Sequence, residues 1–185
     1  MPINFDLQEI KNRFGCNIYF ETGLWDVTTD ETSFCIAMKM DFDKCYSVEI
    51  NPDFVSKANN KFQDEFKQNK MNIFQGDSSR LKEYLDSIDF KDTDRIIFFL
   101  DSHGSGYGCP LIEELTAIKN MNFKRPPILI LDDVRIIRDC VWSDRRYNGD
   151  NFEDILRHKI AEINESYEFS YLDGHIKDDC LIATC

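Results

Sequence analysis

The feature that most constrains this sequence is a regular alternation between short apolar runs and longer stretches of helical periodicity. The short runs are rich in β-branched and aromatic residues, and the longer stretches place apolar side chains three or four positions apart. Parallel strands need crossover connections, which are usually helices, so the alternation predicts a parallel sheet covered by helices on both faces. Strands are expected at 17–21, 45–50, 72–75, 95–100, 128–131, 167–172 and 180–184.

The stretches between these runs supply the expected helices. Apolar side chains recur at helical spacing within 28–40, 52–66, 81–88, 110–118 and 152–163. Pro52 and Pro110 stand where the first turn of a helix tolerates proline. Residues 1–15 are expected to add a short lid helix. A chain of 185 residues has room for one domain, and we expect 1–185 to form it.

The end of the chain departs from the alternation. Only residues 173–179 separate the last two expected strands, which is too short a link for a parallel crossover. These two strands should therefore run antiparallel to each other. The predicted fold class is an α/β, Rossmann-like three-layer sandwich, with a seven-stranded, mostly parallel sheet that carries an antiparallel C-terminal strand pair.

Charge and cysteine content limit the partners and the compartment. The 34 acidic and 22 basic residues give a net charge of −12, which repels phosphate backbones and anionic lipid headgroups. We therefore expect no nucleic acid and no membrane as partner. The N-terminus lacks the pattern of a signal peptide, and no apolar run approaches the roughly 20 residues of a membrane span. The seven cysteines lack metal-type spacing and are interpreted as reduced thiols, so a cytoplasmic protein is expected.

Polar residues follow the carboxyl ends of the first five expected strands. In a doubly wound sheet, ligands bind beyond these ends, near the point where the strand order reverses. The candidate site residues are Glu21, Thr22 and Gly23; Glu49 and Ile50; Gly76, Asp77 and Ser78; Asp101 and His103; and Asp132 and Asp133.

The first three strand ends favour a nucleoside cofactor. Glu49 at a strand tip can accept hydrogen bonds from both ribose hydroxyls, or it is only a solvated strand end. The turn after the first strand has a single glycine, Gly23, which is too few for backbone amides to enclose a pyrophosphate. S-adenosylmethionine, which has no phosphate, tolerates such a turn, unless the turn binds nothing. Asp77 can accept from an adenine amino group, whereas Ser78 or Ser79 can cap the following helix.

The fourth and fifth strand ends favour a metal. The carboxylates of Asp101, Asp132 and Asp133 would repel one another unless a cation neutralised them, and Mg²⁺ prefers oxygen ligands. A metal that bridged two vicinal substrate hydroxyls would lower the pKa of one of them. Asp101 and His103 are the candidate catalytic residues, with His103 as a general base. Alternatively, Asp133 caps the next segment and His103 only hydrogen-bonds within its loop.

Six segments, taken in order, resemble the motifs of the class I S-adenosylmethionine-dependent methyltransferase-like family. They are FETG at 20–23, CYSVEI at 45–50, QGDSS at 75–79, FLDSH at 99–103, CPLIEEL at 109–115 and LDDVR at 131–135. The aspartate cluster is similar to that of metal-dependent sugar O-methyltransferases of the macrocin and noviose type. The resemblance implies the following roles: the methionine end of the cofactor at Glu21 and Gly23, its ribose at Glu49, its adenine at Asp77 and Ser78, and Mg²⁺ at Asp101, Asp132 and Asp133.

These features together predict an S-adenosylmethionine-dependent O-methyltransferase that acts with a divalent metal on a small molecule. The acceptor would be a sugar, a nucleotide-sugar or another vicinal diol. Two alternatives stay open: an inactive binding module of the same fold, favoured by Val27 in the cofactor turn, and a metal-dependent hydrolase. The acceptor pocket would come from loops at 104–108 and 142–150 or from a second subunit, which leaves a homo-oligomer open.

Overall fold

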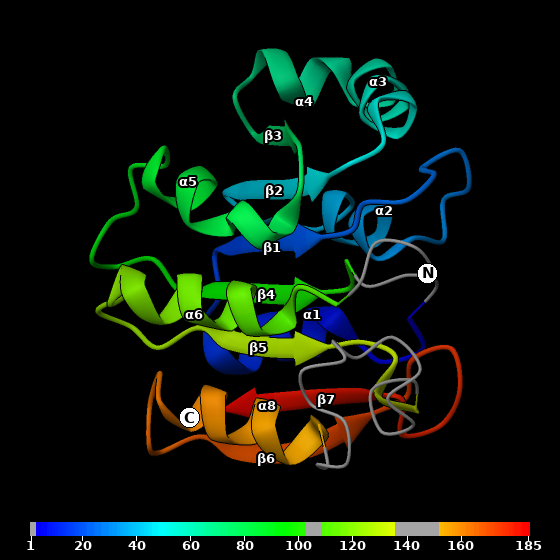
Figure 1. The fold of residues 1–185 in the computed structure, drawn as a ribbon. Helices are drawn as coiled ribbons and strands as arrows, with labels where there is room; N and C mark the ends of the chain where they lie inside the picture. Colours follow the sequence, from blue (N-terminus) through cyan, green and yellow to red (C-terminus); the bar gives the residue numbers. More distant parts are fainter. Residues whose placement is uncertain (1–2, 103–108, 136–151) are drawn as a thin grey trace.

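A computed structural model describes residues 3–102, 109–135 and 152–185. Its centre is a seven-stranded sheet in the order β3-β2-β1-β4-β5-β7-β6 (Figure 1). The first five strands pair in parallel, and β7 runs antiparallel to both of its neighbours, β5 and β6. The predicted fold class is thereby confirmed, and each strand lies within one residue of its expected bounds. The strands are β1 (Ile18–Thr22), β2 (Lys44–Glu49), β3 (Met71–Gln75), β4 (Ile96–Leu100), β5 (Ile128–Leu131), β6 (Glu168–Leu172) and β7 (Cys180–Thr184).

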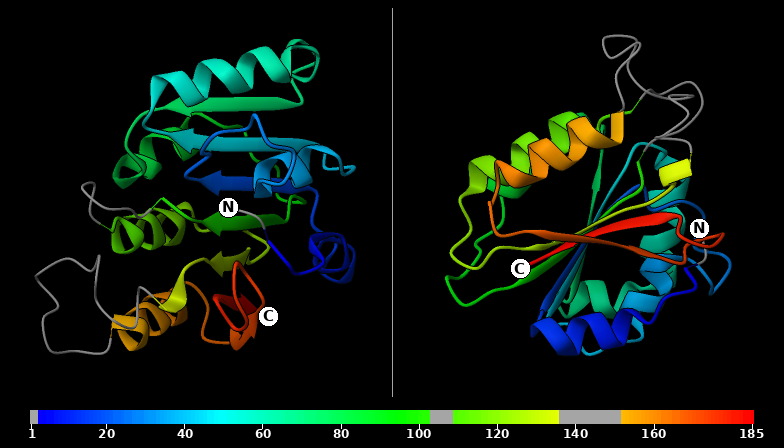
Figure 2. Two further views of the ribbon diagram at one scale, coloured as in Figure 1. Left: turned by 90° about the vertical axis from the view of Figure 1, so that its right-hand side faces the viewer. Right: turned by 90° about the horizontal axis from the view of Figure 1, so that it is seen from below.

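Helices cover both faces of the sheet (Figure 2). One face carries α1 (Leu7–Phe14), α2 (Ser33–Met38) and α3 (Pro52–Lys61), and the other carries α5 (Leu81–Asp86), α6 (Leu111–Met121) and α8 (Phe152–Ala161). The short α4 (Gln63–Lys67) follows α3, and the 3₁₀ turn η1 (Ser78–Arg80) precedes α5.

Alternate side chains of each central strand enter two separate hydrophobic clusters. Along β4, Ile97 and Phe99 pack toward α1 and α2, whereas Phe98 and Leu100 pack toward α5 and α6. Strands buried on both faces need apolar residues at every position, which is why these runs could be recognised in the sequence. β1 is an exception, because it is fully buried yet ends in the polar residues Glu21 and Thr22.

The helix expected as a lid, α1, lies against a face of the sheet. Its Leu7 and Ile10 are buried in the cluster that also holds α2 and α3. The Asp6 side chain accepts a hydrogen bond from the Glu9 amide at its start, and Gly15 ends the helix in the left-handed conformation at φ 63°. Within the described residues, α1 therefore forms part of the outer layer rather than a cover over the carboxyl ends of the strands.

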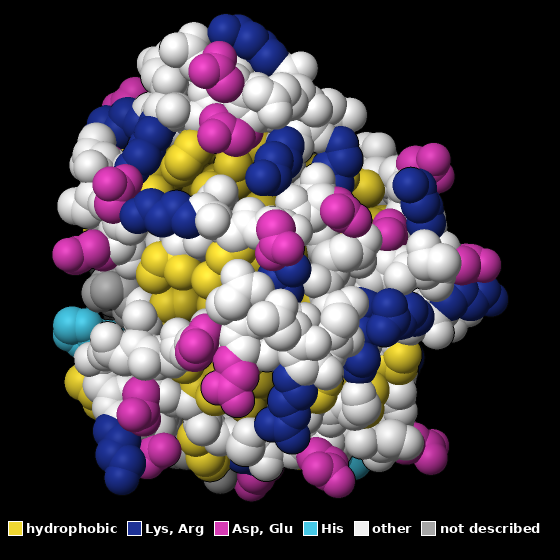
Figure 3. Space-filling model, turned by 180° about the vertical axis from the view of Figure 1, so that it is seen from behind, with side chains coloured by type: hydrophobic (Ala, Val, Ile, Leu, Met, Phe, Trp, Pro, Cys, Tyr) yellow, Lys and Arg dark blue, Asp and Glu magenta, His cyan; other side chains and the backbone are white. Residues whose placement is uncertain are grey.

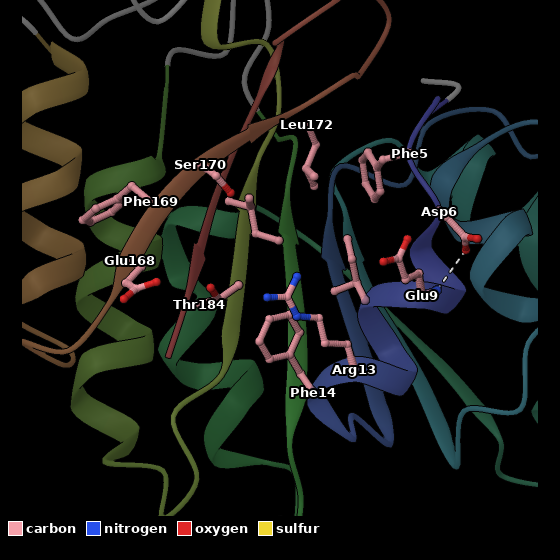
Figure 4. A pocket seen from close by; sticks show the side chains of 12 residues that line it. Phe5, Asp6, Glu9, Arg13, Phe14, Glu168, Phe169, Ser170, Leu172 and Thr184 are labelled. Carbon is pink, nitrogen blue, oxygen red and sulfur yellow. Dashed lines mark hydrogen bonds between the residues drawn. The ribbon is translucent and has the colours of Figure 1, made fainter.

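A groove of about 340 Å³ runs between α1 and the last two strands. In Figure 4, Asp6, Glu9 and Arg13 line one side, and Glu168 and Thr184 line the other. None of its lining residues belongs to β1–β5 or to the turn after any of them, so it lies apart from the expected site. On the side of the molecule drawn in Figure 3, acidic and basic side chains are interspersed.

Two further expectations concern the whole chain. No helix among the described residues is long and apolar enough to cross a membrane. All six cysteines in the described ranges are free thiols, as expected for them; the seventh, Cys140, lies outside those ranges.

Candidate functional site

A pocket of about 350 Å³ opens at the carboxyl ends of β1, β2, β3 and β4. The strand order reverses between β1 and β4, so the pocket lies where this kind of sheet binds ligands. Its volume falls within the roughly 300–1,000 Å³ of small-molecule sites. The pocket brings together seven predicted residues, namely Gly23, Glu49, Ile50, Gly76, Asp77, Ser78 and Asp101. The remaining lining residues were not predicted: Trp25, Val48, Asn51, Phe54, Ser102 and Pro110.

Gly23 allows the turn after β1 to approach the end of β4. Its φ of 84° is in the left-handed region, and a Cβ at this position would lie 2.2 Å from the backbone oxygen of Asp101. The Gly23 amide donates to the Val48 carbonyl at 2.9 Å, which fixes the turn to β2 as well. The floor of the pocket therefore depends on the missing side chain at Gly23.

Glu49 is a buried polar group of the pocket whose carboxylate is held by two backbone amides. The residue is only 7% exposed, and each carboxylate oxygen accepts one backbone amide: Oε2 from Trp25 at 3.0 Å and Oε1 from Asn51 at 2.7 Å. A carboxylate offers about four acceptor positions, so each oxygen can accept one more hydrogen bond. The alternative of a solvated strand end is therefore wrong, because Glu49 is buried and oriented with acceptor capacity to spare.

At the carboxyl end of β3, Gly76 lies close to Tyr84, and Asp77 caps the turn that follows. A Cβ on Gly76 would lie 2.0 Å from the Tyr84 hydroxyl, so a side chain here would displace Tyr84. Asp77 is exposed, and its Oδ1 accepts the Ser79 amide at 2.8 Å at the start of η1. The cap expected from Ser78 or Ser79 is thus supplied by Asp77, while Ser78 is buried in the pocket wall.

Glu21 and Thr22 lie behind the pocket rather than in its lining. Glu21 is fully buried, and the Tyr19 hydroxyl donates to its Oε2 at 2.5 Å. Burial, with a small contribution from the Asp132 charge, raises the pKa of Glu21 to about 7 against the opposing effect of the Tyr19 hydrogen bond. The Thr22 hydroxyl has no hydrogen-bond partner within the described residues. Both residues therefore contribute to the interior, whereas the sequence had placed them on the cofactor.

A second acidic group forms at the ends of β5 and β7. Asp132, Asp133 and Asp179 are all buried and bring one carboxylate oxygen each to within 4.8 Å of the others. Asp101, the third ligand expected from the sequence, is not in this group and lines the pocket instead. Asp179 was missed, although β7 runs antiparallel and therefore begins at the edge where β5 ends.

Asp132, Asp133 and Asp179 together form the acidic cluster. Arg135 neutralises part of its negative charge. Its guanidinium lies 2.6 Å from Asp133 Oδ1 and also pairs with Asp179. Asp132 Oδ1 instead accepts the Asp133 amide at 2.9 Å and the Cys180 thiol at 3.0 Å. Burial and the charge of Asp132 raise the pKa of Cys180, so the thiol stays protonated and can donate.

The acidic cluster has the donors that a hard divalent cation prefers. Three carboxylates supply oxygen ligands, which suits Mg²⁺ or Mn²⁺. Two of them are paired with Arg135, so a metal ion would have to take the place of its guanidinium. The residues fit a divalent ion only if Arg135 can move away.

Solved structures share this backbone arrangement. The O-methyltransferase from Bacillus cereus in complex with SAH has a TM-score of 0.62 at 14% identity, over 96% of this chain and 77% of that one. TomG from Streptomyces achromogenes, in complex with SAM, has a TM-score of 0.60 at 15% identity, over 94% of this chain and 75% of that one. The SAH-bound methyltransferase PaMTH1 from Podospora anserina scores 0.55 at 10% identity, over 94% and 74%.

The chain has the Rossmann-like methyltransferase fold. No protein-family profile matches the sequence, and no curated protein matches it either. The likeness therefore rests on backbone shape.

Two expectations about the methyltransferase fold involve loops. His103 and the loops at 104–108 and 142–150 lie outside the described residues, so the general base and the acceptor loops stay predictions. Val27, in the turn after β1, is fully buried in the core cluster and is absent from the pocket lining. It therefore does not block the pocket, which removes the feature that favoured an inactive module.

Proposed function

We propose that the protein is an S-adenosylmethionine-dependent O-methyltransferase that acts on a small molecule with vicinal hydroxyls, such as a sugar or a nucleotide-sugar. The observation that carries the proposal is the pocket at the strand reversal, where two backbone amides orient the buried Glu49 carboxylate. TomG and the Bacillus cereus enzyme, which share the fold, were solved with SAM and SAH.

Different residues of the pocket would contact different parts of the cofactor. Glu49 would accept hydrogen bonds from the ribose hydroxyls with its remaining acceptor positions. Ile50 and Ser78 would flank the adenine ring, and Asp77 would accept from the adenine amino group. Asp101, across the close approach at Gly23, would face the methionine end.

The turn after β1 is less suited to binding a cofactor that carries phosphates. A pyrophosphate needs several converging backbone amides, and Gly23 is the one glycine available to shape this turn. The cofactor proposed here carries a sulfonium-bound methyl group and supplies it as an electrophile. The pocket residues contribute by position, because holding two reactants in line removes much of the entropic part of a barrier.

The acidic cluster is the proposed metal site. Asp132, Asp133 and Asp179 would hold Mg²⁺, which in such a site lowers the pKa of a bound hydroxyl. Asp101 keeps its assignment to the reacting end of the pocket, and His103 keeps its assignment as general base. Arg135 would leave the cluster when the metal enters, free to face an anionic group of the acceptor.

Calorimetry with S-adenosylhomocysteine tests the foundation of this proposal. Wild-type protein should bind it, whereas no heat at millimolar ligand would overturn the proposal. Asp132→Ala should leave this binding unchanged but abolish methyl transfer to diol substrates. Glu168→Gln in the groove beside α1 is a matched control that should change neither. Methyl transfer that survives Asp132→Ala would remove the metal site from the proposal.

One alternative has a specific observation in its favour. The pairing of Arg135 with Asp133 and Asp179 would suit a binding module that holds the cofactor without using a metal. Such a module would bind S-adenosylhomocysteine and show no turnover in Mg²⁺ with any diol acceptor. The hydrolase alternative gives no task to Glu49 or Gly76, and turnover of phosphoesters without a methyl donor would be its signature.

A further inference from the structure

Trp25 has an unusual backbone conformation at the edge of the cofactor pocket. Its φ of 60° lies in the left-handed region, which bulky side chains rarely adopt. The other described non-glycine residues with positive φ are all Asn or Asp, types that tolerate this region: Asn69, Asn122, Asp133 and Asp178. Trp25 is therefore the exception among the described residues, and such exceptions gather at functional sites.

The contact that holds this conformation comes from the pocket itself. The Trp25 amide donates to Glu49 Oε2 at 3.0 Å, and the Glu49 carboxylate is buried. Turning the Trp25 peptide to an unstrained conformation would leave that oxygen without its amide donor. The turn is thus fixed by the residue assigned to the ribose.

The Trp25 side chain is exposed although it is the largest apolar side chain in the pocket. It is 60% exposed, and its ring centroid lies 5.4 Å from that of Phe54 at an interplanar angle of 53°. Phe54 comes from α3, and both rings line the pocket. An ion pair between Asp26 and Lys57 ties the turn to α3 next to these rings. The two rings therefore form one wall of the pocket, held in place by this ion pair, and the Trp25 ring keeps a face exposed to solvent.

We propose that Trp25, supported by Phe54, packs against the bound cofactor and sets the affinity of the pocket for it. This inference rests on the proposed function, since the ligand is the sulfonium nucleoside or its thioether product. Covering the exposed indole removes apolar surface from water, which accounts for a large side chain kept at a strained position beside the pocket.

Trp25→Gly separates a binding role from a structural one. Glycine adopts φ 60° without strain, so the variant should melt at the same temperature as the wild type or higher. Its Kd for S-adenosylhomocysteine should nevertheless rise roughly tenfold or more, because the ring is lost. Trp25→Phe keeps a ring and should recover most of the affinity. Phe66→Ala, at a 50% exposed aromatic outside the pocket, is the matched control and should bind like the wild type.

A fluorescence titration provides a second readout. Trp25 and Trp142 are the two tryptophans of the chain, so a Trp142→Phe protein reports Trp25 alone. Saturating S-adenosylhomocysteine should shift or quench this emission. Unchanged emission at saturation, or wild-type affinity in Trp25→Gly, would overturn the inference while the proposed function stands. If wild-type protein binds no S-adenosylhomocysteine by calorimetry, the proposed function fails first.

Discussion

The pocket at the carboxyl ends of β1–β4 and the acidic cluster at β5 and β7 occupy one edge of the same sheet, yet their carboxylates are balanced differently. In the pocket, backbone amides orient one carboxylate, Glu49, and leave its remaining acceptor positions for a ligand. In the cluster, Arg135 pairs with two of three carboxylates. The pocket thus keeps free acceptor positions on Glu49, whereas two carboxylates of the cluster already have a cationic partner. The difference teaches that carboxylates at neighbouring strand ends need not be equally available.

Removing Arg135 should have the largest effect. In Arg135→Gln the buried carboxylates lose their counter-ion, and breaking such a pair costs about 3 kcal/mol of unfolding free energy. Millimolar Mg²⁺ should restore much of that loss in the variant and stabilise the wild type less, because there it must displace Arg135; urea melts with and without Mg²⁺ would show the difference. An unchanged melt would mean that Arg135 does not balance the cluster.

The second-largest effect is expected from adding a side chain at Gly23, where the turn lies close to the Asp101 backbone. In Gly23→Ala the new Cβ meets the Asp101 backbone, and the backbone is strained at φ 84°, so we expect a loss of about 2 kcal/mol and weaker S-adenosylhomocysteine binding. Gly15→Ala is the matched control, because its φ is 63° but the nearest atom to its Cβ would lie 3.8 Å away. Equal effects on binding would remove the special role of the Gly23 contact.

Glu21 should make stability depend on pH. Its pKa is raised from 4.5 to about 7 in the folded state, so the folded protein holds a proton that the unfolded chain releases. That contribution is complete below pH 4.5 and is lost as the pH rises through 7, on the order of 1–3 kcal/mol. Glu21→Gln should flatten this part of the stability profile in urea melts between pH 5 and 8. A profile as steep as that of the wild type would assign the decline to other groups.

Glu49→Gln should give the smallest change. The amide keeps one oxygen acceptor but loses the negative charge, and hydrogen bonds to charged groups are roughly twice as strong as neutral ones. We expect roughly tenfold weaker S-adenosylhomocysteine binding by calorimetry. Because the Gln nitrogen cannot accept the backbone amide that one Glu49 oxygen accepts, a loss of about 1 kcal/mol of unfolding free energy should accompany it. Asp64→Asn, at an exposed residue of α4 outside the pocket, is the control.

β4 and β5 could be predicted from the sequence because burial on both faces leaves an unbroken apolar run, and the short link at 173–179 predicted the antiparallel direction of the last two strands. Most of the pocket could be predicted for the same reason, since the residue after each run falls at one edge. Asp179 was missed because it precedes a strand, and only the antiparallel direction of β7 brings it there. Glu21 and Thr22 are buried outside the pocket lining, because side chains at a strand end can face the interior, which residue type does not reveal.

Trp25 and Arg135 show what sequence patterns leave out. The role inferred for Trp25 depends on a positive φ and an exposed ring, and neither can be read from a single letter in a turn. The pairing of Arg135 with buried aspartates depends on the direction of its side chain, which the sequence does not give. Local charge balance depends on where side chains lie, whereas the positions of the strands along the chain can be predicted from periodicity.

The position of β7 between β5 and β6 has a consequence during synthesis on the ribosome. β5 is made well before β7, so its outer edge has no pairing partner until β7 emerges, even when β6 is already available. The residues of that edge, Ile128–Leu131, are all apolar and fully buried in the finished sheet. An unpaired apolar strand edge is a site of aggregation, so the nascent chain is most vulnerable in this interval. Chaperone dependence should therefore rise after β5 is made and fall once β7 has inserted.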